Sequence, residues 1–432
     1  MSARLKPGYL CPTGYKQTEV GVIPEEWAVK QLKKISPAQS VGLVINPSTY
    51  VEDDGTVPML VGSNIKANSI NWDNARRISD ASNKSLPASR LNAGDLVTVR
   101  VGEPGTTAVV PPELDGCNCA SVMIVRKHQS FDSHWLCYVM SSRTGIAQIE
   151  NVQYGTAQKQ FNISDAINFI YATPPLSEQQ AIAEALSDAD SLIDSLEQLI
   201  AKKRHIKQGA MQELLTGKKR LPGFSGEWEM KRLGDVADSN QKWSFTGGPF
   251  GSNLKSSDYV DDGVRIIQLQ NIGDGEFHND SAVFTSQEKA DELLSCNIYP
   301  GEIILSKMGD PVARACIIPS YHERYLMCSD GIRLAVNPKR FNTFFVYISI
   351  NAPDFRTRAE NAGTGSTRKR IGLTELRNLE LLCPGLPEQT AIAAILSDMD
   401  AEIAALETQL TKTRSLKLGM MRNLLTGRIR LL

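Results

Sequence analysis

The sequence predicts an α+β protein in which two similar strand-rich domains are separated by two long helices. Residues 176–221 match residues 386–431 without a gap, at an offset of 386 − 176 = 210 positions, and about half of the paired positions are identical. Both copies carry apolar residues at alternating spacings of four and three, which is typical of a coiled-coil helix. Before each copy lies a block of about 150 residues in which short β-branched runs are separated by Gly, Asn, Asp and Pro, the pattern of strands and turns.

The length and composition are those of an ordinary globular protein with room for two or three domains. Of the 432 residues, 41% are apolar and 22% are charged, and the formal net charge is −1. No apolar run approaches the roughly 18 residues of a membrane span. The first residues lack a signal-peptide pattern, so we expect a cytoplasmic protein without a membrane partner. The eight cysteines and five histidines are scattered, which argues against a zinc site or a disulfide framework.

The two strand-rich blocks share local patterns, which indicates two domains of one type. The matching segments are Trp27, Leu32 and Ile35 with Trp228, Leu233 and Val236; 57–65 with 264–272; 93–105 with 300–312; and 155–174 with 365–384. Other parts of the blocks match poorly, as expected for one scaffold that carries two different binding surfaces. The predicted boundaries are 1–174 for the first domain with its N-terminal segment, 175–221 for the first helix, 222–384 for the second domain and 385–432 for the second helix.

Each helix is expected to span about 40 residues, or about 60 Å at 1.5 Å per residue. The predicted seam consists of Ile182, Leu186, Ile193 and Leu196 in the first copy and of Ile392, Leu396, Ile403 and Leu406 in the second. Two copies of one helix pair most simply with each other, antiparallel about a pseudo-twofold axis, although each could instead pack on its own domain. Gly209 and Gly419 hold equivalent places inside the helices, which indicates a close crossing or a kink, or merely a tolerated glycine.

A duplicated module usually acts on something with two halves, and several motifs agree with that interpretation. They are LSEQQAIAEALSDADSLI and LPEQTAIAAILSDMDAEI, each followed by LLTG; VGVIPEEWAVKQL near the start; GFSGEWEMKRL at the midpoint; and GGPFGSNLKSSDYV in the second domain. In these motifs the chain resembles the specificity subunits of type I restriction-modification enzymes, over nearly its whole length.

The resemblance implies a function that the periodicity alone does not show. In that family, each of two target recognition domains reads one half of a split sequence in double-stranded DNA, and an antiparallel helix pair sets the gap. Two methylase subunits dock on the helices and methylate adenine N6 with S-adenosylmethionine. Motor-nuclease subunits join them to cut unmodified DNA with ATP and Mg. This chain is then expected to be non-catalytic and to hold no cofactor or metal of its own.

The best candidate DNA contacts lie in the loops just before the helices. Glycine lets the backbone approach closely, hydroxyls bond phosphate, and Gln or Arg can make bidentate base contacts. The residues are Gly155, Thr156, Gln158, Lys159 and Gln160 in the first domain, and Ser366, Thr367, Arg368, Lys369 and Arg370 in the second. The alternative is a solvated basic turn that leads into a strand.

Two further places carry candidate DNA-binding residues. Arg100 and Lys307 each stand at the end of a predicted strand, where the cation either reaches DNA or pairs with the neighbouring Glu103 or Asp310. The glycine-rich loop 247–255 offers hydroxyl, amide and ammonium donors, and no clear counterpart is found in the first domain. Its candidates are Ser252, Asn253 and Lys255. A plain glycine-rich turn is the alternative for this loop.

Two other classes of function compete with a DNA-specificity subunit. An autonomous methylase needs an Asn/Asp-Pro-Pro-aromatic site and a glycine-rich cofactor loop, and the sequence has neither. It also lacks a Walker A loop, while the carboxylates of a nuclease are too diffuse in sequence to be judged. A non-catalytic coiled-coil scaffold that binds only proteins stays open, and salt-dependent, sequence-selective DNA binding would distinguish it.

Overall fold

The computed structural model describes residues 11–156, 158–365 and 368–431. The chain forms two compact units, one made of Met1–Gln198 with Thr408–Leu432 and the other of Leu199–Glu407. The division runs through both long helices, so each unit contains one strand-rich domain and a part of each helix. The predicted fold class, two similar α+β domains with two long helices, is confirmed.

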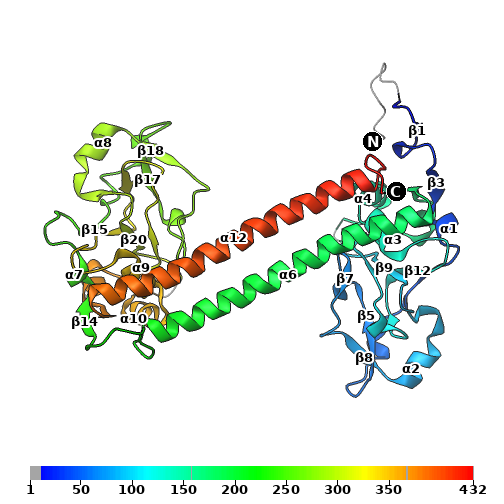
Figure 1. Ribbon diagram of the computed structural model, residues 1–432, viewed down its shortest axis with the longest axis horizontal. Coiled ribbons are helices and arrows are strands. Elements are labelled where there is room, and N and C mark those ends of the chain that lie inside the picture. The colour runs from blue at the N-terminus through cyan, green and yellow to red at the C-terminus, as the bar shows by residue number, and fades with distance from the viewer. Residues whose placement is uncertain (1–10, 157, 366–367, 432) are drawn as a thin grey trace. The chain divides into compact units, whose positions relative to one another are not determined.

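The two long helices have the same length and end in the same way. α6 spans Leu176–Leu214 and α12 spans Leu386–Leu424, 39 residues each (Figure 1). After the helices the chain turns at Gly217 and Gly427, which have φ angles of +68° and +69°. Glycine adopts such left-handed angles without strain, which suits it to the residues that follow a helix.

α6 and α12 pack against each other in antiparallel orientation within each unit. Ion pairs join rising residue numbers in α6 to falling numbers in α12, which defines the direction. The pairs are Asp190 with Lys417 and Glu197 with Arg414 in the first unit, and Lys203 with Glu402 and Lys207 with Asp400 in the second. The ion pairs beside the apolar stripe therefore help to fix the register in which α6 and α12 pack.

The apolar stripe also anchors the helix ends to the domains. Ile182 and Leu186 are fully buried in the core of the first domain, which also contains Leu424 from the end of α12. Ile392 and Leu396 lie in the core of the second domain, together with Leu214 from the end of α6. Each core thus takes the start of one helix and the end of the other. Of the remaining seam residues, Leu196 and Ile403 are buried, and Ile193 and Leu406 are half-buried.

Gly209 and Gly419 occupy open positions in these helices. A β-carbon built at either residue would meet no atom within 4 Å. Both helices run on without interruption through these residues. Within the described part of the chain, no close crossing explains these glycines, and they fit the alternative of tolerated residues.

Each domain is built around a four-stranded sheet with one order of strands. In the first domain the order is β10 (Thr107–Val109), β9 (Leu96–Val99), β12 (Val122–Val125) and β4 (Gln39–Val41). In the second it is β21 (Ala315–Ile317), β20 (Ile303–Ser306), β23 (Gly331–Leu334) and β15 (Phe245–Gly247). Neighbouring strands are antiparallel throughout both sheets. The sheets therefore correspond strand for strand, and β4 corresponds to β15.

A second sheet in each domain contains one parallel pair. The first domain has β11 (Asn118–Cys119), β5 (Val57–Leu60) and β8 (Arg76–Ile78), with β11 and β5 parallel. The second has β16 (Tyr259–Val260), β18 (Val283–Thr285), β17 (Val264–Ile267), β22 (Tyr325–Met327) and β19 (Asn297–Ile298), with β17 and β22 parallel. The two domains therefore share one topology, and the second sheet has five strands in the second domain and three in the first.

Short two-stranded ladders join the start of each domain to the strand that precedes its long helix. They are β3 (Ala28–Gln31) with β13 (Ile170–Thr173), and β14 (Glu229–Arg232) with β24 (Glu380–Cys383). The other short strands are β1 (Tyr15–Thr18), β2 (Gly21–Pro24), β6 (Ile65–Lys66) and β7 (Ser69–Ile70). The shorter helices are α1 (Leu32–Ile35), α2 (Asp80–Ser85), α3 (Ser133–Met140), α4 (Arg143–Val152), α5 (Ile163–Ala166), α7 (Leu233–Val236), α8 (Gln287–Glu292), α9 (Thr343–Asn351), α10 (Pro353–Ala362) and α11 (Leu373–Asn378).

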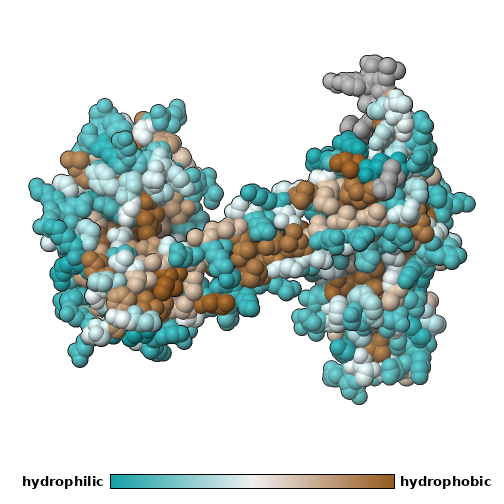
Figure 2. Space-filling model, in the orientation of Figure 1, coloured by the Kyte–Doolittle hydropathy of each residue, from teal (hydrophilic) through white to brown (hydrophobic). Residues whose placement is uncertain are grey.

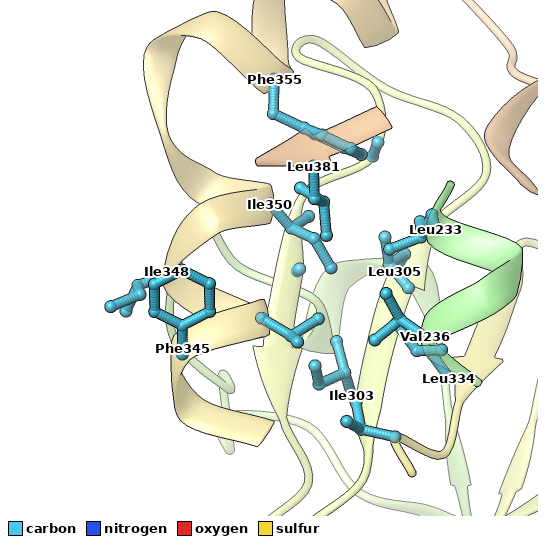
Figure 3. Packing of buried hydrophobic residues seen from close by; sticks show 14 of the residues in the cluster. Leu233, Val236, Ile303, Leu305, Leu334, Phe345, Ile348, Ile350, Phe355 and Leu381 are labelled. Carbon is cyan, nitrogen blue, oxygen red and sulfur yellow. The ribbon is translucent and has the colours of Figure 1, made fainter. Parts of the chain in front are cut away.

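The core of the second domain lies between its four-stranded sheet and the helices α7, α9 and α10. Figure 3 shows Leu233 and Val236 of α7 beside Leu305 of β20 and Leu334 of β23, with Phe345 of α9 across the cluster. All five side chains are completely buried. Burial of this apolar area stabilises the domain and holds the strand ends that carry the candidate site.

A cluster of three side chains, here named the Trp–Glu–Arg clasp, occurs once in each unit. In the first, Nε1 of Trp27 donates to Glu178 (2.9 Å), and Arg430 donates two hydrogen bonds to the same carboxylate (2.6 and 2.9 Å). The guanidinium also lies over the indole, 5.9 Å from its centroid. The clasp of the second unit consists of Trp228, Glu388 and Arg220, with the corresponding hydrogen bonds at 3.2, 2.7 and 2.7 Å.

Among the residues that the structure describes, no helix could cross a membrane. Even the two 39-residue helices lack a stretch that is long and apolar enough to span a bilayer.

Candidate nucleic-acid interface

The ends of two strands place the candidate residues of each domain at one end of the four-stranded sheet. β4 and β9 are both antiparallel to β12, which lies between them, so they run in the same direction and finish at the same end. β15 and β20 have the same relation to β23. We name this edge, where β4 and β9 or β15 and β20 finish, the loop end of the domain.

In the first domain, two segments that the sequence singles out meet at the loop end. The N–H of Gly102 donates to the carbonyl of Lys159 (3.1 Å), and the N–H of Phe161 donates to the carbonyl of Arg100 (3.3 Å). Nε of Arg100 also donates to the carbonyl of Phe161 (3.3 Å). The turn after β9 therefore lies directly beside the end of the loop 155–160.

The second domain repeats this arrangement. The N–H of Gly309 donates to the carbonyl of Lys369 (3.2 Å), and the N–H of Ile371 donates to the carbonyl of Lys307 (2.9 Å). The turn after β20 thus joins the loop 365–370. Ser366 and Thr367, which the sequence predicts as contacts, lie outside the described residues.

Glycine is required at the entrance to both loops. Gly155 has φ = +96°, and a β-carbon there would lie 2.2 Å from the carbonyl oxygen of Gln158. Gly365 has φ = +106°, and its β-carbon would lie 2.9 Å from the carbonyl oxygen of Arg368. The backbone bends back on itself at both residues, which presents Thr156, Gln158, Lys159 and Arg368 to the surface; all four are exposed, and Gln160 is half-buried.

The cations of the loop ends fall into two groups. Lys369 pairs with Glu360 (3.0 Å), and Arg370 pairs with Asp330 (3.3 Å). The second group makes no ion pair within the described residues. It consists of Arg100, Lys159, Lys255, Lys307 and Arg368. The pairings with Glu103 or Asp310 that the sequence leaves open are therefore not made, and these cations are available to an anionic ligand.

The third candidate loop, 247–255, leaves β15 at the same loop end. Ser252, Asn253 and Lys255 are all exposed on it. The sequence shows no counterpart in the first domain, but the structure supplies one in residues 42–49, which leave β4. Gly42 lies against the carbonyl of Cys119 as Gly248 lies against that of Cys328, since β-carbons there would approach these oxygens to 2.7 and 1.7 Å.

Sequence reasoning missed three exposed apolar residues on these two loops. Phe250 is 83% exposed in the second domain, and Val44 and Ile45 are 70% and 57% exposed in the first. Only the positions of Gly42 and Gly248 could have indicated the correspondence, because the residues around them differ.

The basic residues of the helix ends are mostly neutralised within the protein. Lys203, Arg204 and Lys207 pair with acidic residues of α12. Lys219 pairs with Glu213, and Arg220 belongs to the clasp. These side chains therefore contribute to helix pairing, and the unpaired cations of the loop ends are the stronger candidates for contact with an anion.

The loop ends offer the chemistry of binding: cations, amides, hydroxyls and backbone N–H groups. Buried thiols elsewhere stay protonated, since burial raises the pKa of Cys316 and of Cys117 to about 12. Among the described residues, no group of three or more His, Cys, Asp or Glu side chains could hold a metal ion.

The fold and these surfaces define a duplicated recognition protein, with one binding end in each domain. A family model described as type I restriction modification DNA specificity domain matches residues 24–203 and again residues 225–413. The chain belongs to this family. It is therefore a DNA-specificity subunit of a type I restriction-modification system, which is a recognition subunit and not a catalytic one.

Relatives and a solved structure of similar type extend over nearly the whole chain. A protein of Methanocaldococcus jannaschii assigned as the specificity subunit of the type I restriction enzyme MjaX is 25% identical, with 96% of each chain covered. The MjaVIII specificity subunit of the same organism is 22% identical, with 94% of each covered. The crystal structure of the S subunit from M. genitalium superposes with a TM-score of 0.57 at 14% identity, covering 92% of this chain and 96% of that one, which supports the fold.

Proposed function

We propose that each loop end reads one half of a bipartite site in double-stranded DNA. The observation that carries this proposal is the duplicated junction of a strand-end cation with a glycine-hinged loop, Arg100 with 155–160 and Lys307 with 365–370. Cations bound to phosphates set the register of the protein on the duplex, and amide side chains read base edges in the grooves.

The division of roles within a loop end follows from side-chain chemistry. Lys159, Lys255 and Arg368 suit phosphate contacts, because they are exposed and have no ion-pair partner in the described residues. Gln158 and Asn253 offer both a donor and an acceptor, which is the pattern that pairs with N6 and N7 of adenine. The two half-sites are expected to differ in sequence, since the residues around the two junctions differ.

The helices would hold the two halves of the site at a fixed gap and dock two methylase subunits. Figure 2 shows brown, apolar side chains along the helix pair. Four large apolar residues of the two helices are 46–65% exposed: Leu192 and Ile206 in α6, and Leu416 and Leu418 in α12. Exposed apolar patches of this kind are typical of protein interfaces.

In the assembled complex the chemistry belongs to the partners. The methylase subunits would use S-adenosylmethionine to methylate adenine N6, and motor-nuclease subunits would use ATP and Mg to cut unmodified DNA. This chain would supply sequence recognition only and bind no cofactor. Its place of action would be the cytoplasm, where it meets chromosomal DNA.

The test is a genome-wide map of N6-methyladenine in host cells with and without the gene for this chain. We expect a split motif, two short half-sites at a fixed gap, to disappear on deletion. A variant with residues 156–160 replaced by alanine, which keeps the required Gly155, should alter only one half of the motif. The matched variant with residues 366–370 replaced, which keeps Gly365, should alter only the other half.

Loss of both halves from a single loop variant would indicate a folding defect and not a change in recognition. Two other outcomes would count against the proposal. Methylation or cleavage of DNA by the isolated chain would show that it is an enzyme. A chain that assembles with its partners but binds DNA without sequence preference would be a protein-interaction scaffold.

A further inference from the structure

Both domains expose large apolar side chains at equivalent places, the loops that leave β4 and β15. Phe250 is the most exposed large apolar residue of the described chain at 83%, and Val44 follows at 70%. Single exposed apolar residues are common on protein surfaces. Here, however, they recur at one topological position in two domains whose loop sequences differ, which indicates a shared use.

Backbone hydrogen bonds hold the start of both loops close to the sheet, which fixes the positions from which the apolar side chains project. The N–H of Gly42 donates to the carbonyl of Val122 (2.9 Å), and that of Gly248 donates to Gly331 (2.8 Å). Neither glycine has room for a β-carbon. A turn closed by the N–H of Asn253 and the carbonyl of Phe250 (2.8 Å) then fixes the tip.

The apolar tips stand on the same loop end as the unpaired cations. One strand, β23, separates the strand that leads to Phe250 from the strand that leads to Lys307, and β12 separates Val44 from Arg100 in the same way. At 4.7–4.9 Å between neighbouring strands, the loops start about 10 Å apart. This is about three base pairs along a duplex.

We propose that Phe250 in the second domain, and Val44 with Ile45 in the first, contact the 5-methyl groups of thymine in the major groove. This inference rests on the proposed function and adds to it the kind of base-pair feature that each loop reads. The thymine methyl is the largest apolar group that a base pair presents in the major groove, where cytosine has only a C5 hydrogen at the equivalent place and the other edge groups are mostly hydrogen-bond donors or acceptors. An apolar tip therefore has its best partner on an intact duplex in the thymine methyl.

The test uses the complex of the full chain with its methylase subunits, and duplexes that carry its motif. Uracil replaces thymine at one position at a time, which removes only the methyl group. We expect one position in the half-site of the second domain to lose about fourfold in affinity, the size of one buried methyl group. Phe250→Ala should weaken binding at least as much, and uracil at that position should then have no further effect.

The matched control is Tyr321→Ala. Tyr321 is 63% exposed, but it follows β21 and lies at the end of the sheet opposite to Lys307. Affinity and the uracil profile should stay unchanged in this variant. A double variant, Val44→Ser with Ile45→Ser, should remove the uracil effect only in the half-site of the first domain.

Salt dependence separates this contact from a phosphate contact. Phe250→Ala should leave the slope of log affinity against log salt unchanged, because an apolar contact releases no counterion, while Lys255→Ala should reduce it by about 0.9.

Several results would overturn the inference while leaving the proposed function intact. They are a Phe250→Ala complex that binds as tightly as the wild type, uracil effects that persist in the variant, and a variant that loses methylase subunits instead of DNA affinity. The last result would assign the tip to a protein partner. If the wild-type complex showed no sequence preference at all, the proposed function itself would fail.

Discussion

At the scale of single residues, the two Trp–Glu–Arg clasps fix how each domain meets the helix ends. Glu178 is almost completely buried, with 2% of its side chain exposed, and it accepts hydrogen bonds from both Trp27 and Arg430. The hydrogen bonds to Glu178 raise the pKa of the Arg430 guanidinium, which therefore stays charged over the whole accessible pH range. A buried carboxylate of this kind depends on its cation, because an unpaired buried charge is costly.

Replacing Glu178 by Gln should therefore loosen the first domain where it joins α6. Glutamine keeps an acceptor for Trp27 but leaves Arg430 paired only with the exposed carboxylate of Glu26. We expect the free energy of local unfolding to fall by about 2 kcal/mol. This is below the range for breaking a fully buried ion pair, because Arg430 is partly exposed. Hydrogen exchange of the segment 27–35 measures this local stability and should become about thirtyfold faster.

The control is Glu26→Gln. Glu26 also pairs with Arg430 (3.0 Å), but its side chain is 69% exposed, and exposed pairs contribute little. In the Glu26→Gln variant, the hydrogen-exchange rates of the segment 27–35 should stay within a factor of about two of those of the wild type. Equal effects of the two substitutions would show that burial of Glu178 is not what gives the clasp its strength.

The sequence predicts some of these residues and not others. Trp27 has the same spacing to Leu32 and Ile35 as Trp228 has to Leu233 and Val236, which marks it in the sequence, and it is buried. Its partner Arg430 is 403 positions away, and no local pattern connects them. Phe250 escapes notice for a related reason: exposure is a property of the folded surface, which composition does not reveal.

At the scale of elements, the periodicity of the sequence predicts the long helices, but it does not explain the glycines inside them. Gly209 lies in the interior of α6, and a β-carbon there would meet only open space. Replacing Gly209 by Ala should stabilise the helix by about 1 kcal/mol, because alanine loses less backbone freedom on folding. Slower hydrogen exchange of the amides of α6 would register this gain.

Gly427 provides a comparison with the opposite sign. It has φ = +69°, and its β-carbon would lie 2.4 Å from Cδ of Pro24, so Gly427→Ala should destabilise the first unit. If Gly209→Ala were to weaken co-purification with the methylase subunits, the glycine would instead mark a place where a partner approaches the helix backbone.

The loops show why the candidate site could be predicted only in part. The repeated register of 155–160 and 365–370 is visible in the sequence, since both loops join the helix repeat without a gap. Their junctions with Arg100 and Lys307 depend on backbone hydrogen bonds between distant segments. The order of the strands, which brings the loop after β15 to the same end, is likewise a long-range property that no local spacing encodes.

At the scale of the whole molecule, charge limits how strongly the chain alone can bind DNA. The net charge is −1, and the unpaired cations of the two loop ends number two in the first domain (Arg100 and Lys159) plus three in the second (Lys255, Lys307 and Arg368), five in total. If all five contact phosphates, log affinity should fall with log salt at a slope no steeper than about −4.5.

A salt titration of the isolated chain with a duplex measures this slope. Replacement of any one of the five cations by alanine should reduce its magnitude by about 0.9. A slope much steeper than the predicted limit would indicate that Lys203, Arg204 and Lys207 exchange their acidic partners on α12 for DNA, which would move part of the interface onto the helices.

The fold class, the duplication and the helix pairing are all readable from the sequence, because a repeated seam of this length has few alternatives. The division of the chain into compact units could not be predicted from the sequence, because both units contain parts of both helices. This division arises because the start of one helix and the end of the other share a core, as Leu186 and Leu424 do.

That sharing has a consequence for the order in which the protein can fold during synthesis. The second unit is one continuous segment, Leu199–Glu407, whereas the first consists of Met1–Gln198 and Thr408–Leu432. A ribosome that makes the chain from its N-terminus therefore releases everything the second unit needs before the first can be finished. The domain that is synthesised first is therefore the last to be completed. Until the end of α12 is made, the apolar side chains of its core that pack against Leu424 and Leu425 stay exposed.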